Sequence, residues 1–207
     1  MTDLNITLHH GDLPADVKFG NIVAMDCEMM GLNPLRDKLC LAQISDNGKD
    51  IHLVKFDITK SYSAPNLKAL LEDSSKEKIF HFARADMGFL IQHLNAEPSN
   101  IFCTKVASKL CRTYTDSHGL KSVLKELLNV ELSKEQQTSH WGVAEFSDAQ
   151  IEYAARDVVY LHQIREELGN RVEQLGRTEL LNDTNKFIPV LAKLELQGWN
   201  ETILNHH

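Results

Sequence analysis

The sequence has few of the residues on which a crosslinked or zinc-supported fold depends. Its 207 residues include four cysteines, and no two of them form a CxxC pair or take a zinc-like spacing with histidine. This pattern argues against a disulfide scaffold and a structural zinc site, and it predicts buried free thiols in a reducing cytosol. The four are Cys27, Cys40, Cys103 and Cys111.

Long apolar stretches are also missing. No apolar run approaches the ~18 residues that a bilayer-spanning helix needs, and the first residues lack the basic region and apolar core of a signal peptide. No Pro-, Gly- or Ser-rich linker divides the chain. We therefore expect one soluble, cytoplasmic domain over residues 1–207 without membrane contact.

Positive charge is in short supply as well. The chain has 22 Lys and Arg against 29 Asp and Glu, for a net charge of −7. This balance argues against a protein that holds long duplexes through a broad basic face. It leaves room for nucleic acid chemistry at one point, because bound divalent cations can supply local positive charge.

The first third of the chain reads as strands and the rest mainly as helices. Strands are expected over residues 22–25, 39–45, 51–56 and 78–82, and Asn47-Gly48 predicts an antiparallel hairpin between the second and the third. The helical pattern begins beyond Arg84. A strand-rich part followed by helices predicts the α/β class, with a mixed central sheet flanked by helices.

Three signals locate individual helices. Asn66 is expected to cap a short helix ending near Leu71. Ser147 and Gln150 form an S-x-x-Q capping box, which predicts a long helix with an apolar stripe reaching Leu168. Pro189 should start, end or kink a helix in the C-terminal segment.

Acidic residues in apolar settings are the most informative feature of the sequence. Asp26 and Glu28 follow the apolar strand 22–25, and side chains two apart on a strand point to the same face. Asp86 comes five residues after His81. Tyr153 and Asp157 are four residues apart on the long helix, so they share one face of it.

These four carboxylates have no matching Arg or Lys at each position, which indicates hard-cation ligation. Oxygen ligands favour Mg²⁺ or Mn²⁺ over zinc. Two such ions about 3.5–4 Å apart can stabilise both the attacking and the leaving oxygens of a phosphodiester displacement. The predicted ligands are Asp26, Glu28, Asp86 and Asp157.

In this order the acidic motifs resemble those of the DEDDy 3′→5′ exonucleases. The resemblance implies a ribonuclease H-like fold and five catalytic residues: Asp26, Glu28, Asp86, Tyr153 and Asp157. The stretch 103–161 is similar to ribonuclease D, through its Thr104-Lys105, Gly119-Leu120-Lys121 and Ser139-x-Trp141 elements. Tyr153 would orient the attacking water, since a phenol with a pKa near 10 is a poor bulk base.

The compact length and the run 112–121, RTYTDSHGLK, resemble the short nano-RNase C diribonucleotidases of alphaproteobacteria. This resemblance implies a catalytic core over residues 20–168, a helical extension over 169–207 and no HRDC domain. It also implies a homo-oligomer, which in that family is an octameric ring with its active sites facing the interior. The many apolar residues between 187 and 199 add weak support.

Six residues are candidates for substrate contact. Leu32 follows Gly31 as in oligoribonuclease motif I, where the leucine inserts between two bases; the alternative is that it only caps the sheet. His118 and Lys121 either contact phosphate or are solvated. Lys134, Gln137 and Trp141 precede the catalytic helix and can lean over the nucleotide, although a buried Trp141 is the simpler reading.

The sequence thus predicts a metal-dependent 3′→5′ exoribonuclease that releases nucleoside 5′-monophosphates from diribonucleotides and very short RNA. The preference for a short substrate follows in part from the net charge of −7, which gives little general attraction to polyphosphate. Two alternatives stay open. One is a general ribonuclease D-like exonuclease trimming 3′ ends of longer RNA or DNA, and the other is a non-catalytic RNA-binding scaffold.

Overall fold

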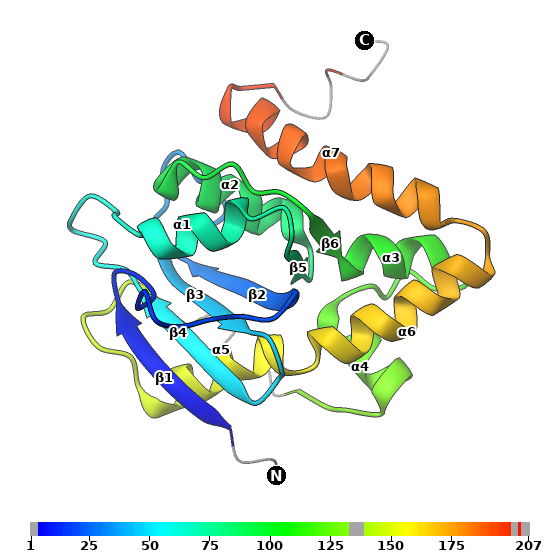
Figure 1. Ribbon diagram of the computed structural model, residues 1–207, viewed down its shortest axis with the longest axis horizontal. Helices are drawn as coiled ribbons and strands as arrows, with labels where there is room; N and C mark the ends of the chain where they lie inside the picture. Colours follow the sequence, from blue (N-terminus) through cyan, green and yellow to red (C-terminus); the bar gives the residue numbers. More distant parts are fainter. Residues whose placement is uncertain (1–3, 133–138, 200–202, 204–207) are drawn as a thin grey trace.

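The computed structural model describes residues 4–132, 139–199 and 203. Within these ranges the chain forms four consecutive strands, then strands and helices that alternate as far as the last strand, and then helices alone (Figure 1). The strands are β1 (Asn5–His10), β2 (Ile22–Met29), β3 (Leu39–Ser45), β4 (Asp50–Lys55), β5 (Glu77–Phe80) and β6 (Ile101–Cys103). The helices are α1 (Pro65–Glu72), α2 (Ala83–Leu94), α3 (Thr104–Cys111), α4 (Leu120–Leu128), α5 (Asp148–Val159), α6 (Leu161–Gln174) and α7 (Thr178–Leu196).

The strands form one mixed sheet in the order β1-β4-β3-β2-β5-β6. The pairs β2–β3 and β3–β4 are antiparallel, whereas β1–β4, β2–β5 and β5–β6 are parallel. The expected hairpin at Asn47-Gly48 is confirmed. Gly48 takes a φ of 70°, and the Asn47 side chain accepts hydrogen bonds from the amides of Lys49 and Asp50 at 2.8 Å.

Helices cover both faces of this sheet and produce two apolar cores. One core lies between the sheet and α1, α2 and α7, and the other lies between the sheet and α3 to α6 (Figure 1). Strand β2 supplies both, because alternate side chains point to opposite faces: Val23 and Met25 enter the first core and Ala24 the second. The predicted mixed sheet with flanking helices is confirmed.

Several boundaries differ from the expected ones. Strand β1 was not expected, and β2 continues through the acidic residues as far as Met29. The capping box at Ser147 is confirmed, but the long helix divides at Tyr160 into α5 and α6. Pro189 lies inside α7, whose residues Ile188 and Ala192 are buried in the first core.

The expected cap of α1 was wrong. Ala64 is the N-cap residue, and Asn66 lies in the first turn, where its side chain donates to the carbonyl of Leu13. The exposed helix amides are instead capped from a distant segment, because the Asp12 carboxylate accepts from the backbone amides of Asn66 and Leu67 at 2.8 and 2.9 Å.

The four cysteines are free, as expected, and all but the half-buried Cys111 are buried. Within the described ranges, no helix is both long and apolar enough to cross a membrane.

Candidate active site

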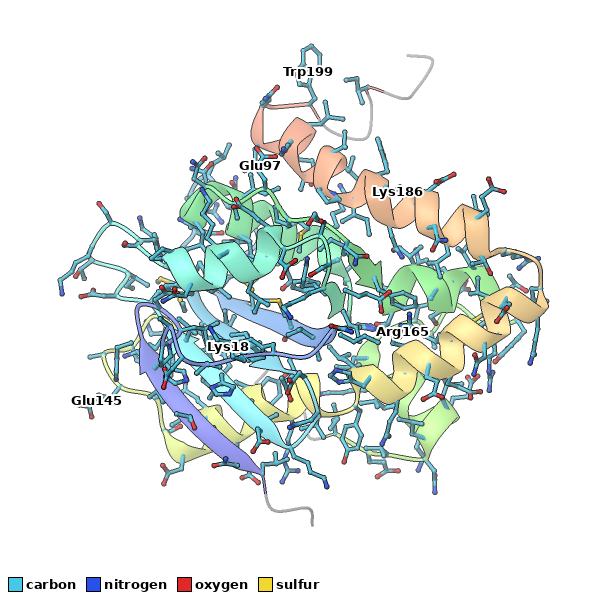
Figure 2. All side chains as sticks on the ribbon, viewed as in Figure 1. Lys18, Glu97, Glu145, Arg165, Lys186 and Trp199 are labelled. Carbon is cyan, nitrogen blue, oxygen red and sulfur yellow. The ribbon has the colours of Figure 1, made fainter. Side chains whose placement is uncertain are left out.

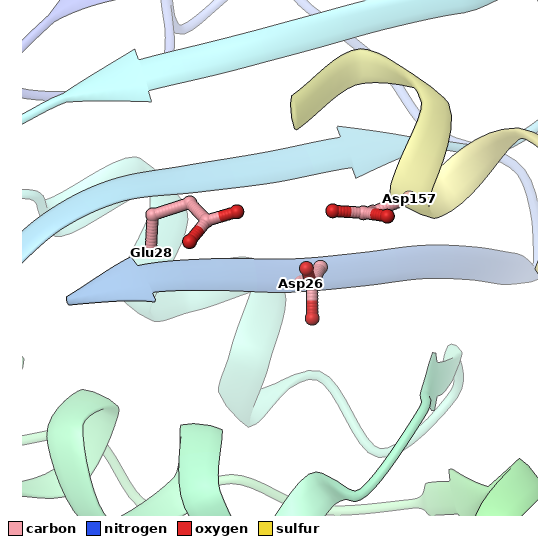
Figure 3. Close-up of side chains that lie close together, drawn as sticks. All are labelled: Asp26, Glu28 and Asp157. Carbon is pink, nitrogen blue, oxygen red and sulfur yellow. The ribbon is translucent and has the colours of Figure 1, made fainter. Parts of the chain in front are cut away.

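Strand β2 and helix α5 bring three carboxylates together. Asp26 and Glu28 alternate with Cys27 along β2, so they point to the face covered by α5, while Cys27 joins the opposite core. Asp157 projects from α5 toward Asp26 and Glu28 (Figure 3). One oxygen from each of the three lies within 4.8 Å of the other two.

Burial and mutual repulsion define the electrostatics of this group. Burial, reinforced by the neighbouring carboxylates, raises the pKa of Asp26 well above its usual range and that of Glu28 to about 9. Burial raises the pKa of Asp157 to about 7, although the Lys121 ammonium and a hydrogen bond from Tyr153 oppose the shift. The ionised cluster therefore needs positive charge beyond that of Lys121.

Asp86 reaches the site from the other side of β2. It lies in the first turn of α2 and is 3% exposed. Burial raises its pKa to about 8, despite hydrogen bonds from the thiol and backbone amide of Cys27. Asp86 is not one of the three carboxylates that share a 4.8 Å cluster, yet its charge helps to raise the pKa of both Asp26 and Glu28. Its role as a metal ligand stays a prediction.

Tyr153 lies one helical turn before Asp157 and hydrogen-bonds with that carboxylate. Burial raises the pKa of the phenol above its ordinary value, and the surrounding carboxylates raise it further. The phenol is therefore protonated over the physiological range. It can donate a hydrogen bond but is not a base, which matches the orienting role expected for it.

The donor set suits a hard divalent cation. All three clustered ligands are carboxylates, which Mg²⁺ and Mn²⁺ prefer, and Cys27 points to the opposite core. The acids repel one another, and a bound cation would relieve that repulsion. Asp26, Glu28 and Asp157 are the residues that would hold the ions, with Asp86 beside them.

A cavity of about 640 Å³ opens over the carboxylates. Leu32 lines the cavity and is 91% exposed, so its side chain is not packed against the sheet. Lys121 lies in the first turn of α4 and also lines the cavity. Trp141 borders it but is buried, and its ring is 6.2 Å from that of Tyr153. Substrate contact by these residues stays a prediction.

His118 takes a different position from the one expected. Its ring nitrogen Nδ1 is 2.9 Å from the Ser108 hydroxyl, and the buried ring does not line the cavity. Lys134 and Gln137 lie outside the described residues. Their neighbours Leu132 and Ser139 line the cavity, and the Gln150 side chain donates to the Ser139 hydroxyl at 2.7 Å.

Phe82 and Lys105 also line the cavity, although the sequence did not indicate either as a site residue. Phe82 takes a left-handed conformation (φ 72°, ψ 47°) directly before α2, and its ring is partly exposed. The Lys105 ammonium lies 3.8 Å from the centre of that ring, a cation–π contact. Left-handed backbone is uncommon outside glycine, so a phenylalanine carries no local signal for it.

The comparisons with known proteins agree with this geometry. A model of the 3′-5′ exonuclease family matches residues 12–173. Ribonuclease D of Gluconacetobacter diazotrophicus is 29% identical over 157 residues, which are 76% of this chain and 39% of that protein. The chain thus spans about two fifths of the length of the curated ribonuclease D proteins that it matches first.

Solved structures match most of the chain. NrnC of Brucella melitensis bound to pGG is 44% identical, with a TM-score of 0.92 over 99% of this chain and 100% of that one. NrnC with bound Mg²⁺ is 43% identical, with the same TM-score and coverage. Escherichia coli RNase D is 25% identical, with a TM-score of 0.73 over 83% of this chain and 45% of that one. The family and fold class that the acidic motifs predicted are confirmed, and the chain belongs to the 3′–5′ exonuclease family, with ribonuclease D among its relatives.

Proposed function

We propose that this protein is a metal-dependent 3′→5′ exoribonuclease that releases nucleoside 5′-monophosphates and acts preferentially on dinucleotides. The observation that carries the proposal is the carboxylate cluster of Asp26, Glu28 and Asp157 beneath a cavity, in a chain of the 3′–5′ exonuclease family. Mg²⁺ bound to an NrnC structure at 43% identity supports the cofactor.

The residues divide the work by their chemistry. Two Mg²⁺ or Mn²⁺ ions, when bound, would activate the attacking water and neutralise charge on the scissile phosphate. Asp26, Glu28 and Asp157 hold them, with Asp86 as the fourth carboxylate. Tyr153 stays protonated and orients the water by hydrogen bonding, while its bond to Asp157 fixes the position of the phenol.

The size and shape of the cavity support a short substrate. Its 640 Å³ falls in the range of small-molecule sites, roughly 300–1,000 Å³. Leu32 projects from the rim with little burial of its own, as a side chain that separates two bases would. An NrnC relative has been solved with the dinucleotide pGG.

Lys121 is the better of the two predicted phosphate contacts. It lines the cavity, and its charge acts on Asp157, so an anionic substrate there would meet it. His118 is hydrogen-bonded to the Ser108 hydroxyl and does not line the cavity. A 5′-phosphorylated dinucleotide ends in a phosphate dianion. In a longer chain the phosphate at that position is a diester with a single negative charge, so its attraction to a lysine is weaker.

Turnover on matched substrates tests this function. Purified protein with Mg²⁺ is given 5′-phosphorylated 2-mers and 7-mers, each as RNA and as DNA, and mononucleotide release is measured. We expect the RNA 2-mer to be cleaved fastest, and Leu32→Ala to slow the 2-mer without changing metal binding. Leu35→Ala, at another exposed leucine outside the cavity, is the matched control. Equal or faster turnover of the 7-mer contradicts the dinucleotide preference.

A specific observation favours a second function, trimming of longer 3′ ends. The curated relatives matched first carry the name ribonuclease D, and the E. coli structure is described as an exoribonuclease involved in structured RNA processing. The same assay separates the two, because a trimming enzyme favours the 7-mer. Binding of RNA without mononucleotide release would favour the scaffold.

We further propose a homo-oligomer, an octamer by resemblance, working in the cytoplasm. Helix α7 and the residues after it expose large apolar side chains, and Trp199 projects away from the fold (Figure 2). The exposed residues are Leu180, Phe187, Val190, Trp199 and Ile203. Light scattering at micromolar concentration should give a mass several times 23.5 kDa, and a monomer contradicts the proposal.

A further inference from the structure

A polar side chain is buried without a partner in the middle of strand β3. Gln43 is fully buried between the apolar residues Ala42 and Ile44. Among the described residues, neither the nitrogen nor the oxygen of its side-chain amide has a hydrogen-bond partner. Buried amides are ordinarily hydrogen-bonded, because leaving one unpaired costs its full desolvation penalty. An apolar residue would stabilise this strand better.

The location of Gln43 connects it to the carboxylates. It is the register partner of Asp26 across the antiparallel β2–β3 pair, next to the Glu28–Leu41 pair. Residues directly opposite in such a pair point to the same face, with Cβ atoms about 4.5–5.5 Å apart. Figure 3 shows β3 running beside β2 at the acidic cluster. Gln43 does not line the cavity, so its amide is placed behind Asp26, under α5.

We propose that Gln43 is a positioning residue of the metal centre: its amide N–H donates to the ionised carboxylate of Asp26 and fixes the orientation of that ligand. A carboxylate has two oxygens, so one can bind the cation while the other accepts from the amide. Hydrogen-bonded groups behind metal ligands set their direction and their affinity. This inference rests on the proposed metal-dependent function.

Replacing Gln43 with methionine tests the role while nearly preserving volume. For Gln43→Met we expect a metal-free melting temperature equal to or above that of the wild type, because the unpaired amide is gone. We also expect the rise in melting temperature caused by Mg²⁺ to shrink, and the half-saturating Mg²⁺ concentration to increase 10- to 100-fold. Both quantities come from thermal unfolding over a Mg²⁺ titration.

Lys78→Met is the matched control. Lys78 is another fully buried polar residue of the sheet, on β5, but its ammonium is satisfied by the Asp73 carbonyl at 2.6 Å. Its replacement should lower the metal-free melting temperature and leave the half-saturating Mg²⁺ concentration unchanged. The half-saturating Mg²⁺ concentration should therefore increase only for Gln43→Met, and the metal-free melting temperature should fall only for Lys78→Met.

The outcomes separate this inference from the proposed function. If Mg²⁺ stabilises the wild type and Gln43→Met to the same extent at the same concentrations, Gln43 has no positioning role and the inference is overturned. If Mg²⁺ and Mn²⁺ fail to stabilise even the wild type, the proposed metal centre itself is wrong. A second measurement needs no variant: the side-chain NH₂ signals of Gln43 in the nuclear magnetic resonance spectrum should shift on Mg²⁺ addition. Unchanged signals with Mg²⁺ bound would also overturn the inference.

Discussion

Two groups of charged side chains in this protein differ in how their charge is balanced. Around Arg112, which is 1% exposed, the chain supplies every partner: the Ser108 hydroxyl at 2.8 Å, the Ser117 carbonyl at 2.9 Å and the Glu126 carboxylate at 3.0 Å. Hydrogen bonding to Arg112 lowers the pKa of Glu126 to about 2. In the acidic cluster the pKa of Glu28 moves the other way, to about 9.

The opposite pKa shifts of Glu126 and Glu28 indicate different roles for the Arg112 group and the acidic cluster. The Arg112 group is neutralised from within, so it fixes the loop between α3 and α4 and contributes to stability in the free protein. The acidic cluster has no matching positive charges within the protein, so the repulsion between its carboxylates is relieved by bound protons or by an external cation. Four predictions probe this contrast, from the largest expected effect to the smallest.

Removing a ligand of the acidic cluster should destroy activity without destabilising the fold. We expect Asp157→Ala or Asp26→Ala to lose at least about 10³ of the rate, within the range of lost electrostatic stabilisation. Asp157→Asn should lose as much, while the metal-free melting temperature stays or rises because a source of repulsion is gone. Rates and thermal unfolding measure the two effects.

The control is Asp148→Asn, at an exposed position of the same helix, which should keep its activity. Full activity of Asp157→Ala, or undiminished wild-type activity in excess EDTA, would show that the reaction does not depend on this cluster.

Breaking the Arg112 group should have the reverse effect. Arg112→Met leaves the Ser117 carbonyl without its donor and should lower the free energy of unfolding by about 1–3 kcal/mol. The Mg²⁺-induced rise in melting temperature should remain. Urea unfolding measures the loss, with Arg156→Met as the matched control. The pair of Arg156 with Glu152 is exposed, so its removal should cost about 0–1 kcal/mol. Equal losses of unfolding free energy in Arg112→Met and Arg156→Met would show that the Arg112 group contributes no more to stability than an exposed ion pair.

Tyr153→Phe should reduce the rate about 10- to 100-fold, since a hydrogen bond to a charged group is worth about 1.5–3 kcal/mol. The phenol is an orienting donor rather than a ligand, so the half-saturating Mg²⁺ concentration should hardly change. Steady-state kinetics over a Mg²⁺ titration gives both values. A loss as large as that of Asp157→Ala would assign Tyr153 a direct role in the chemistry.

The pH dependence of the metal-free protein should reflect the acidic cluster. The folded-state pKa values of about 7 for Asp157, 8 for Asp86 and 9 for Glu28 all lie above the unfolded value near 4. At intermediate pH the folded chain therefore holds more protons than the unfolded chain, and its stability falls as pH rises from about 4 through 9. Saturating Mg²⁺ should flatten this decline. Melting temperatures with and without Mg²⁺ would show it, and a metal-free stability that rises over this range would contradict it.

Local sequence patterns were enough to predict several strands, a turn, a helix start and part of the candidate site. The period of apolar residues indicated the central strands, Asn47-Gly48 the hairpin, and Ser147 with Gln150 the start of α5. The i, i+2 spacing of Asp26 and Glu28 placed both on one face of a strand, where the structure has them. Each of these features depends on neighbours in the sequence.

Features that depend on contacts between distant segments of the chain were not predicted. The cap of α1 comes from Asp12, more than fifty residues away, and Asn66 only looked like the source. The break at Tyr160 falls inside a continuous helical pattern, so tertiary packing rather than propensity ends α5. His118 is a residue type that can contact phosphate, but its hydrogen bond to Ser108 was not visible in the sequence.

Helix α5 carries Ala154 and Ala155, both fully buried, on the side that meets the sheet. Such short side chains let a helix settle close to the strands, so an aspartate, with a single methylene, suffices to reach from α5 to β2. The distance between α5 and the sheet thus determines how close Asp157 comes to the carboxylates on β2. Bulk added at either alanine would lift Asp157 out of reach without touching any acidic residue. The size of the side chain at these two positions therefore affects the ligand geometry, although neither alanine has a reactive group.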